Sequence, residues 1–281
     1  MTSIDPRLSA YLARIGLAGI PPASRAGLEH WLAAHRQAIA FENLDIPLGR
    51  GIAIDGDSVF DKLVTRARGG YCFEQNRLFS DMLALAGFAN RPLLARVRLS
   101  VAEGHTPPRT HVLLLVDLGG EAWIADAGFG GSFVPPLRLE DGAEGRTPDG
   151  AAHRLRRLPD GEWLLERAGP PAATDGRAAH HEDWQAQYGF ELGLVAPEDL
   201  EQCNHWTATR PGTRFTTLRV VSRVLPDGFA ALTDRALTIY RGGAVERATV
   251  ESVADYAKVL RERFGLELPE EELARLRLFE G

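Results

Sequence analysis

The stretch RARGGYCFEQN, residues 66–76, places one of only two cysteines directly after a glycine pair and at the head of an apolar helical pattern. If a helix begins near Cys72, the thiol lies at the positive end of the helix dipole, among backbone N–H groups without partners in the helix. Such positions favour thiolate over thiol, as a nucleophilic cysteine requires. The stretch alone leaves a second interpretation open, because free cysteines are often simply buried apolar residues.

The composition is that of a globular protein without a basic surface. Of 281 residues, 44% are hydrophobic and 25% are charged, and the formal net charge is −6. This negative charge disfavours nucleic acid as a partner. Two cysteines do not make a disulfide framework, and no closely spaced set of Cys and His indicates structural zinc. Because the sequence has no signal-type N-terminus and no run of about 18 apolar residues, we expect no membrane span and a cytoplasmic location.

A nucleophilic cysteine needs a base, and the base needs a group that orients it. Among eight histidines, His111 opens an apolar hairpin, HVLLLVDLGGEAWIADAGFGG, whose second strand ends at Asp126. The two residues lie nine positions before and six positions after Gly120 of the glycine turn, so they are expected at one end of the sheet. A His–Asp hydrogen bond would satisfy a buried carboxylate. A solvated strand-end histidine and a turn aspartate remain the alternative.

The other histidines are poorer candidates for the base. His30 and His35 fall on an amphipathic helical pattern and are expected on the surface, and His205 is either structural or lines a cleft. The rest lie in polar, loop-like surroundings: His105, His153, His180 and His181.

The period of the apolar residues divides the chain into three regions. Residues 1–88 have helical spacing, residues 89–195 form short β-like runs broken by Gly, Pro and Asp, and residues 196–281 mix both types. Within the second region, residues 140–152 are expected to form a mobile loop. A cysteine at a helix start, followed by His and Asp on a β region, is typical of papain-like and transglutaminase-like architecture. We therefore expect an α+β chain of several domains.

Five segments together resemble the arylamine N-acetyltransferases. They are FENLDI at 41–46, RGGYCFEQN at 68–76, HVLLLVDL at 111–118, DAGFGG at 126–131 and NHWTATRPGTRF at 204–215. The resemblance implies a helical bundle at 1–88 that carries the nucleophile, a β-barrel-like domain at 89–195 that carries His and Asp, and an α/β lid at 196–281. It also implies the length of a bacterial member.

The resemblance implies a role for each residue of the Cys-His-Asp set. Cys72 corresponds to the nucleophile that accepts the acetyl group, His111 to the base that forms a thiolate–imidazolium pair with it, and Asp126 to the carboxylate that orients the imidazole. The implied cosubstrate is acetyl-CoA, and no metal is implied. In the implied ping-pong reaction, CoA leaves before an arylamine, arylhydrazine or N-hydroxyarylamine takes the acetyl group.

The resemblance also suggests residues that bind the two substrates. The aromatic acceptor site corresponds to Phe41, Tyr71, Val97 and Phe129, although core packing explains each of them as well. Contacts to the donor are expected from Thr110, Gly128, Phe129 and Gly130. Two further expectations complete the site: Glu42 and Arg68 form a supporting buried ion pair, and Cys203 has no part in the chemistry.

Two other functions use the same residues. Some members of the family are amide synthases that close macrolactams, and a Cys-His-Asp set also serves cysteine hydrolases that cleave peptides or amides. The sequence separates neither from an acetyltransferase, and it indicates neither the natural amine nor the oligomeric state.

Overall fold

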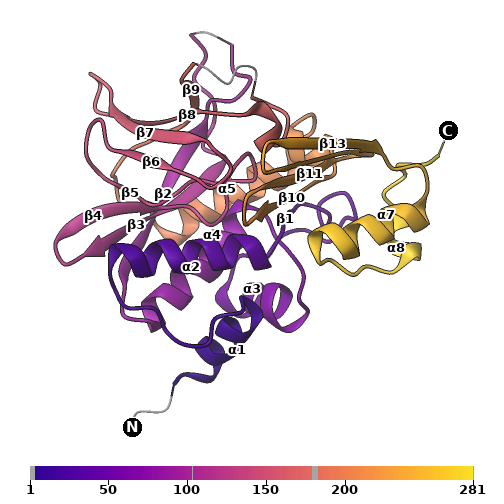
Figure 1. Ribbon diagram of the computed structural model, residues 1–281, viewed down its shortest axis with the longest axis horizontal. Helices are drawn as coiled ribbons and strands as arrows, with labels where there is room; N and C mark the ends of the chain where they lie inside the picture. Colours follow the sequence, from indigo (N-terminus) through magenta and orange to yellow (C-terminus); the bar gives the residue numbers. More distant parts are fainter. Residues whose placement is uncertain (1–3, 103, 179–182, 281) are drawn as a thin grey trace.

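The first part of the chain is helical, as its apolar spacing predicts. The computed structural model describes residues 4–102, 104–178 and 183–280. Helices α1 to α4 gather in the lower part of the molecule (Figure 1). Their bounds are α1 (Pro6–Arg14), α2 (Arg25–Ala38), α3 (Gly56–Phe60), which continues as a π-helical turn (Asp61–Thr65), and α4 (Cys72–Leu85).

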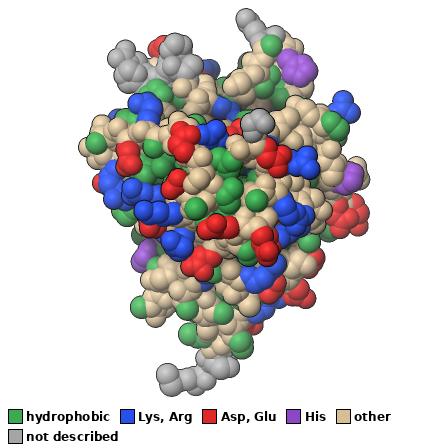
Figure 2. Space-filling view, turned by 90° about the vertical axis from the view of Figure 1, so that its right-hand side faces the viewer, with side chains coloured by type: hydrophobic (Ala, Val, Ile, Leu, Met, Phe, Trp, Pro, Cys, Tyr) green, Lys and Arg blue, Asp and Glu red, His purple; other side chains and the backbone are tan. Residues whose placement is uncertain are grey.

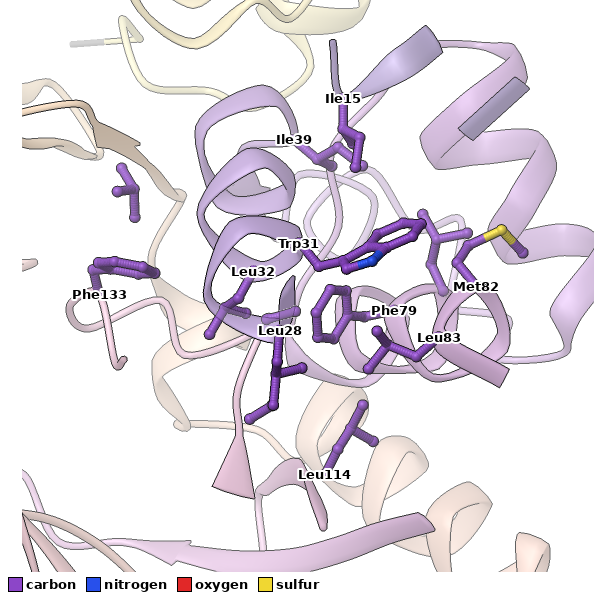
Figure 3. Close-up of a cluster of buried hydrophobic side chains, with 14 of the residues drawn as sticks. Ile15, Leu28, Trp31, Leu32, Ile39, Phe79, Met82, Leu83, Leu114 and Phe133 are labelled. Atoms are coloured by element: carbon purple, nitrogen blue, oxygen red, sulfur yellow. The ribbon is translucent and has the colours of Figure 1, made fainter. Parts of the chain in front are cut away.

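A shared apolar core holds these helices together and against the first sheet. Trp31 of α2 and Phe79 of α4 face each other in this core, and Met82 and Leu83 of α4 surround them (Figure 3). Leu114 from the sheet belongs to the same cluster. Burial of such side chains stabilises the fold by roughly 1.5–3 kcal/mol each. The core therefore fixes α4, and with it Cys72, against the sheet.

Eight antiparallel strands form the first sheet, in the order β5-β4-β3-β2-β9-β8-β7-β6. The two edge strands curl toward each other, since a Cβ built on Gly145 of β6 would lie 2.7 Å from the side chain of Leu137 in β5. The strands are β2 (Ala89–Val97), β3 (His111–Leu118), β4 (Glu121–Ala125), β5 (Leu137–Arg138), β6 (Glu144–Arg146), β7 (Ala152–Arg157), β8 (Trp163–Ala168) and β9 (Gln185–Phe190).

The predicted glycine-turn hairpin is confirmed as β3–β4. Gly119 and Gly120 have φ values of +67° and +90°, a conformation that glycine adopts without strain. The expectation of a mobile loop at 140–152 is wrong, because β6 lies there and pairs with β7. His153, also expected in a loop, is buried on β7. His180 and His181 lie outside the described residues.

The second sheet has five antiparallel strands, and one of them comes from the helical region. β1 (Phe41–Glu42) pairs with β10, so that Phe41 lies opposite Ser222. This pairing joins the segment before Cys72 to the last part of the chain. The remaining strands are β10 (Val220–Leu225), β11 (Gly228–Thr233), β12 (Ala236–Arg241) and β13 (Ala244–Thr249).

Helices precede and follow the second sheet. α7 and α8 pack on it through a separate apolar cluster around Tyr256, Leu260 and Phe264, and Figure 1 shows them beside the C-terminus. A short 3-10 turn (Pro171–Ala173) precedes β9. The helices are α5 (Pro197–Thr209), α6 (Arg214–Thr217), α7 (Val253–Val259), which continues as a π-helical turn (Leu260–Phe264), and α8 (Glu270–Ala274).

The surface carries charges of both signs. On the face shown in Figure 2, basic and acidic side chains are interspersed. No helix in the described part of the chain has both the length and the apolar character needed to cross a membrane. Among the same residues, no group of three or more His, Cys, Asp or Glu side chains is placed to hold a metal ion.

Candidate active site

Cys72 is the first residue of α4, as the sequence predicts. The helix start is held by Glu74, whose Oε2 accepts a hydrogen bond of 3.0 Å from the backbone N–H of Tyr71. Cys72 is only 3% exposed, and its Sγ donates to the carbonyl oxygen of Thr110 at 3.6 Å. The thiol therefore lies against the residue that directly precedes His111.

The helix start does not by itself produce a thiolate. Burial raises the pKa of the Cys72 thiol, and the negative charge of Asp126 raises it further, whereas the backbone N–H groups of Phe73, Val112 and Cys72 lower it. The expectation that the helix N-terminus leaves a low thiol pKa is therefore wrong, because desolvation outweighs the N–H groups. A thiolate here needs a compensating positive charge beside it, and His111 lines the same cavity as Cys72.

His111 and Asp126 meet as the hairpin geometry predicts. His111 begins β3, Asp126 follows the last residue of β4, and Leu114 lies opposite Ala125 in the register. The Nε2 of His111 and the Oδ2 of Asp126 are 2.7 Å apart, and both side chains are buried. The alternative of two solvated residues is thereby excluded. Since Nε2 faces the carboxylate, Nδ1 is the nitrogen left to exchange a proton with another group.

Asp126 stays ionised because three donors surround it. Burial raises its pKa, but the attraction to His111 and hydrogen bonds from His111, Asn76 and Gly128 outweigh burial, so that the pKa lies below its usual value. The Oδ1 accepts from Nδ2 of Asn76 at 3.1 Å and from the N–H of Gly128 at 2.9 Å. The same Asn76 accepts from the N–H of Ala127 at 3.0 Å. Asn76 therefore ties α4 to the residues that follow β4.

Gly128 allows this close approach. A Cβ at this position would lie 2.7 Å from the Cα of Cys72 and 2.6 Å from Nδ2 of Asn76, distances that real Cβ atoms do not reach. Buried Arg36 holds the same loop from the other side, donating to the carbonyl oxygens of Ala127 (3.1 Å) and Phe129 (2.9 Å). The loop after β4 thus packs directly on Cys72.

Aromatic rings enclose the imidazole. The ring centroids of Tyr188 and Phe129 lie 5.0 Å and 5.3 Å from that of His111. Burial raises the pKa of Tyr188, and the charge of Asp126 raises it further, so its hydroxyl stays protonated. These rings exclude water from the His–Asp pair.

His35, which we expected on the surface, is fully buried and belongs to a chain of hydrogen bonds. Burial lowers the pKa of His35 to about 3, so the ring is neutral. Its Nδ1 lies 2.6 Å from the hydroxyl of Tyr11 and its Nε2 lies 2.6 Å from Oε1 of Gln75. Gln75 in turn donates to the carbonyl oxygens of Ala40 (2.8 Å) and Gly70 (3.1 Å). These hydrogen bonds therefore connect α1 and α2 to the turn before Cys72.

The expected Glu42–Arg68 ion pair is present and belongs to a larger buried network. Oε1 of Glu42 lies 2.6 Å from Nη2 of Arg68, and Nη2 also lies 3.2 Å from Oδ1 of Asp45. Lys62 lies 2.7 Å from both Asp45 and Glu74. Because Glu74 also holds the start of α4, this network supports the position of Cys72.

A cavity of about 200 Å³ lies over Cys72 and His111. Six of the seven residues proposed for substrate contacts line it, which are Phe41, Val97, Thr110, Gly128, Phe129 and Gly130. Tyr71 does not line this cavity. It is fully buried, packs against Phe73 and Phe215, and donates its hydroxyl proton to Oδ1 of Asn204.

Other residues around the cavity lack a signal of their own in the sequence. Trp206, Thr207, Thr213, Arg214 and Phe215 line it, and they fall within or beside the segment NHWTATRPGTRF. Asp175 and Arg177, from the stretch before β9, complete this wall. For Asn76 a signal did exist, because Cys72, Gln75 and Asn76 share one helix face, and polar side chains on a buried face need partners.

Comparison with known proteins identifies the family of the chain. A family model described as N-acetyltransferase matches residues 26–273. The chain is 40% identical over 266 residues to the arylamine N-acetyltransferase of Escherichia coli K12, which covers 94% of this chain and 90% of that protein. It is 35% identical over 266 residues to that of Mycolicibacterium smegmatis, with 93% and 92% covered.

Solved structures give the same result. The arylamine N-acetyltransferase from Salmonella typhimurium superposes with a TM-score of 0.89 at 37% identity, covering 98% of both chains. The Mycobacterium marinum arylamine N-acetyltransferase in complex with CoA superposes with a TM-score of 0.84 at 33% identity, covering 96% of this chain and 98% of that one. The chain belongs to the arylamine N-acetyltransferase family.

Proposed function

We propose that this protein transfers an acetyl group from acetyl-CoA to an aromatic amine through a thioester on Cys72. The observation that carries the proposal is the meeting of three groups: His111 and Asp126 are hydrogen-bonded at 2.7 Å, and His111 shares one cavity with Cys72. A nucleophile, a base and an orienting carboxylate are what covalent acyl transfer requires.

In the first half-reaction, the proton of Cys72 moves to Nδ1 of His111, and Asp126 stabilises the imidazolium through Nε2. The sulfur attacks the carbonyl carbon of the thioester. The bond between that carbon and the sulfur of CoA then breaks, and His111 returns its proton to the departing thiolate. In this half-reaction, the thioester of acetyl-CoA is replaced by a thioester on Cys72. Backbone N–H groups of Phe73 and Val112 stabilise negative charge on the Cys72 sulfur before the attack.

In the second half-reaction, the neutral amine attacks the acetyl carbon on Cys72. His111 takes the proton that the nitrogen loses as the new C–N bond forms. The bond between the acetyl carbon and Cys72 breaks, and the thiolate–imidazolium pair is restored. The products are an N-acetylated amine and the free enzyme.

The cavity supports a sequential use of one site. A cavity of roughly 150 Å³ holds a benzene molecule, so about 200 Å³ accommodates one aromatic ring or the thioester end of the donor, but not both. This size suits a ping-pong reaction, in which the donor leaves before the amine enters. We assign the walls Phe41, Val97 and Phe129 to the aromatic ring of the acceptor. Thr110, Gly128 and Gly130, together with Phe129, are assigned to the donor.

The three sequence regions have separate tasks in this proposal. The region 1–88 supplies the nucleophile, 89–195 supplies His111 and Asp126, and 196–281 covers the cavity with side chains such as Phe215. This division corresponds to the papain-like layout with a barrel-like central domain and a C-terminal lid. Tyr71, which the sequence suggested for the acceptor site, is given a supporting role instead, because it lies beneath the cavity wall.

The names of the relatives support both substrates. The M. marinum structure holds CoA. The Salmonella typhimurium relative, 40% identical over 265 residues, is named arylamine N-acetyltransferase and N-hydroxyarylamine O-acetyltransferase. These names support the proposed acceptors, which are arylamines, arylhydrazines and N-hydroxyarylamines.

Steady-state kinetics with acetyl-CoA and aniline test the proposal. Varying one substrate at several fixed concentrations of the other should give parallel double-reciprocal lines, the pattern of a reaction in which the first product leaves before the second substrate binds. Cys72→Ala should remove the activity, whereas Cys203→Ala should retain it. Intersecting lines contradict the covalent route. A cysteine hydrolase would release CoA at an undiminished rate without any amine, and a macrolactam-forming amide synthase would fail to load from acetyl-CoA.

A further inference from the structure

One wall of the cavity is positively charged. The lining residues include Arg177, Arg214 and Asp175, while most of the other walls are apolar. Two guanidinium groups and one carboxylate leave an excess of one positive charge, in a chain whose formal net charge is −6. The sign of this wall is therefore opposite to that of the whole protein.

Asp175 holds the two arginines side by side. Its Oδ2 lies 2.7 Å from Nη2 of Arg177 and 3.2 Å from Nη2 of Arg214. The carboxylate is 1% exposed, whereas the side chains of Arg177 and Arg214 are 19% and 22% exposed. The carboxylate is thus covered, and the two guanidinium groups are the charged groups that a ligand in the cavity meets.

Among the residues that the structure describes, the hydrogen bonds of the two arginines do not use all of their donors. A guanidinium carries five N–H donors, and one shared carboxylate oxygen satisfies only a few of the ten. Within residues 4–102, 104–178 and 183–280, the Nε of Arg214 is buried without a hydrogen-bond partner. Burial lowers the pKa of Arg214, the charges of Asp175 and Asp234 oppose this, and the charge of Arg177 adds to it more weakly than Asp175 opposes it. The N–H groups that Asp175 does not accept from are therefore the donors that an anion in the cavity would meet.

The pair lies close to the reacting groups. The N–H of Asp175 donates to the carbonyl oxygen of Gly131 at 3.0 Å. A Cβ built on Gly131 would lie 2.9 Å from the ring of Phe129 and 3.3 Å from Nη2 of Arg177. Since the ring of Phe129 packs on His111 at a centroid distance of 5.3 Å, the guanidinium groups lie just beyond the aromatic wall next to the base.

We propose that Arg177 and Arg214 form a binding site for an anionic group of a substrate that enters this cavity. The group is either a phosphate of the acetyl donor or a carboxylate on the aromatic acceptor, because guanidinium groups bind both in the same bidentate manner. The inference rests on the proposed acetyl transfer, and it names two specificity-determining residues for that reaction.

The test compares Arg177→Gln and Arg214→Gln with wild type in two arms. The donor arm measures kcat/KM for acetyl-CoA and for S-acetylpantetheine, a thioester without phosphates. The acceptor arm measures kcat/KM for 4-aminobenzoate and for aniline, with S-acetylpantetheine as the donor. In a ping-pong reaction each value reports one half-reaction. Arg154→Gln is the control, because Arg154 is also ion-paired and 25% exposed but lies outside the cavity lining.

We expect each variant to lower kcat/KM for the charged member of one arm by roughly tenfold, the effect of one lost charged hydrogen bond. The uncharged member and the control should change less than about twofold. A loss with acetyl-CoA identifies the phosphate, and a loss with 4-aminobenzoate identifies the carboxylate. The proposal is overturned if kcat/KM falls equally for the charged and the uncharged substrate of an arm. It is also overturned if kcat/KM is unchanged in both arms. Arg177→Gln alone decides the case if Arg214→Gln does not fold.

Direct binding separates this inference from the proposed function. If the wild type transfers no acetyl group from either thioester, the proposed function fails. Calorimetry then compares CoA with pantetheine and 4-aminobenzoate with aniline on the same variants. A roughly tenfold weaker affinity for the charged member alone would retain the anion site, and unchanged affinities would reject it.

Discussion

Replacing Asp126 by asparagine tests whether this residue sets the proton position on His111. In the native site, Oδ2 accepts from Nε2 of His111 at 2.7 Å, and Oδ1 accepts from Asn76 at 3.1 Å and from the N–H of Gly128 at 2.9 Å. All three partners are donors. The carboxylate therefore keeps Nε2 protonated and leaves Nδ1 free to accept the proton of Cys72.

An asparagine at this position has one oxygen and two possible orientations. If its oxygen faces Asn76 and Gly128, two hydrogen bonds survive, but the amide NH2 then faces Nε2 of His111, which must give up its proton. In the reversed orientation the NH2 faces two donors, and each buried donor left unsatisfied costs about 1–3 kcal/mol. The first orientation is preferred, and it moves the imidazole proton to Nδ1, where it prevents transfer from Cys72.

We expect Asp126→Asn to fold and to lose about 10³–10⁴-fold in kcat/KM, as the same change does in a Ser-His-Asp enzyme. The loss corresponds to roughly 4–5.5 kcal/mol of transition-state stabilisation. The assay follows CoA release in the presence of aniline, and circular dichroism confirms folding. Asp117→Asn is the matched control, because Asp117 lies near the end of β3 in the same hairpin and accepts from the N–H of Gly120 in the turn. A folded Asp126→Asn protein that retains more than about a tenth of the wild-type activity refutes the reasoning.

Two further predictions concern ionisation. Because burial raises the pKa of both thiols, the reactivity of Cys72 must depend on His111. Iodoacetamide should label Cys72 faster than the half-buried Cys203 near pH 6 in the wild type, and slower in His111→Gln; an unchanged order, read by peptide mass spectrometry, contradicts this. Burial also raises the pKa of Glu74 to about 7, against the opposing effect of Lys62. A raised carboxyl pKa means proton uptake on folding, so the stability of the wild type relative to Glu74→Gln should fall as pH rises from about 5 to about 8. A difference in melting temperature that stays constant over this range would count against it.

The positions of the proposed catalytic residues could be predicted because they depend on local signals. The glycine pair and the helix pattern place Cys72 at the start of α4, and the Gly119–Gly120 turn sets the register that brings His111 to Asp126. Both signals lie within about twenty residues of the site that they define. The resemblance of five segments then identified the family, which the comparisons confirm.

The parts that failed depend on contacts between distant segments. The surface position expected for His35 was wrong because its partners, Tyr11 and Gln75, lie on two other helices. The thiol pKa was misjudged because the degree of burial of Cys72 is a property of the packed domain. Likewise, Arg177 and Arg214 come together only through Asp175, and nothing in their sequence spacing predicts that contact.

The most direct test of the central claim is the reaction of the enzyme with acetyl-CoA in the absence of an amine. Without an acceptor, only the first half-reaction proceeds rapidly, so we predict a burst of about one CoA per active site, followed by slow release. Intact-mass analysis should find one added acetyl group, absent from Cys72→Ala, and aniline should remove it. Steady CoA release without an acetylated protein would contradict the account and indicate a hydrolase.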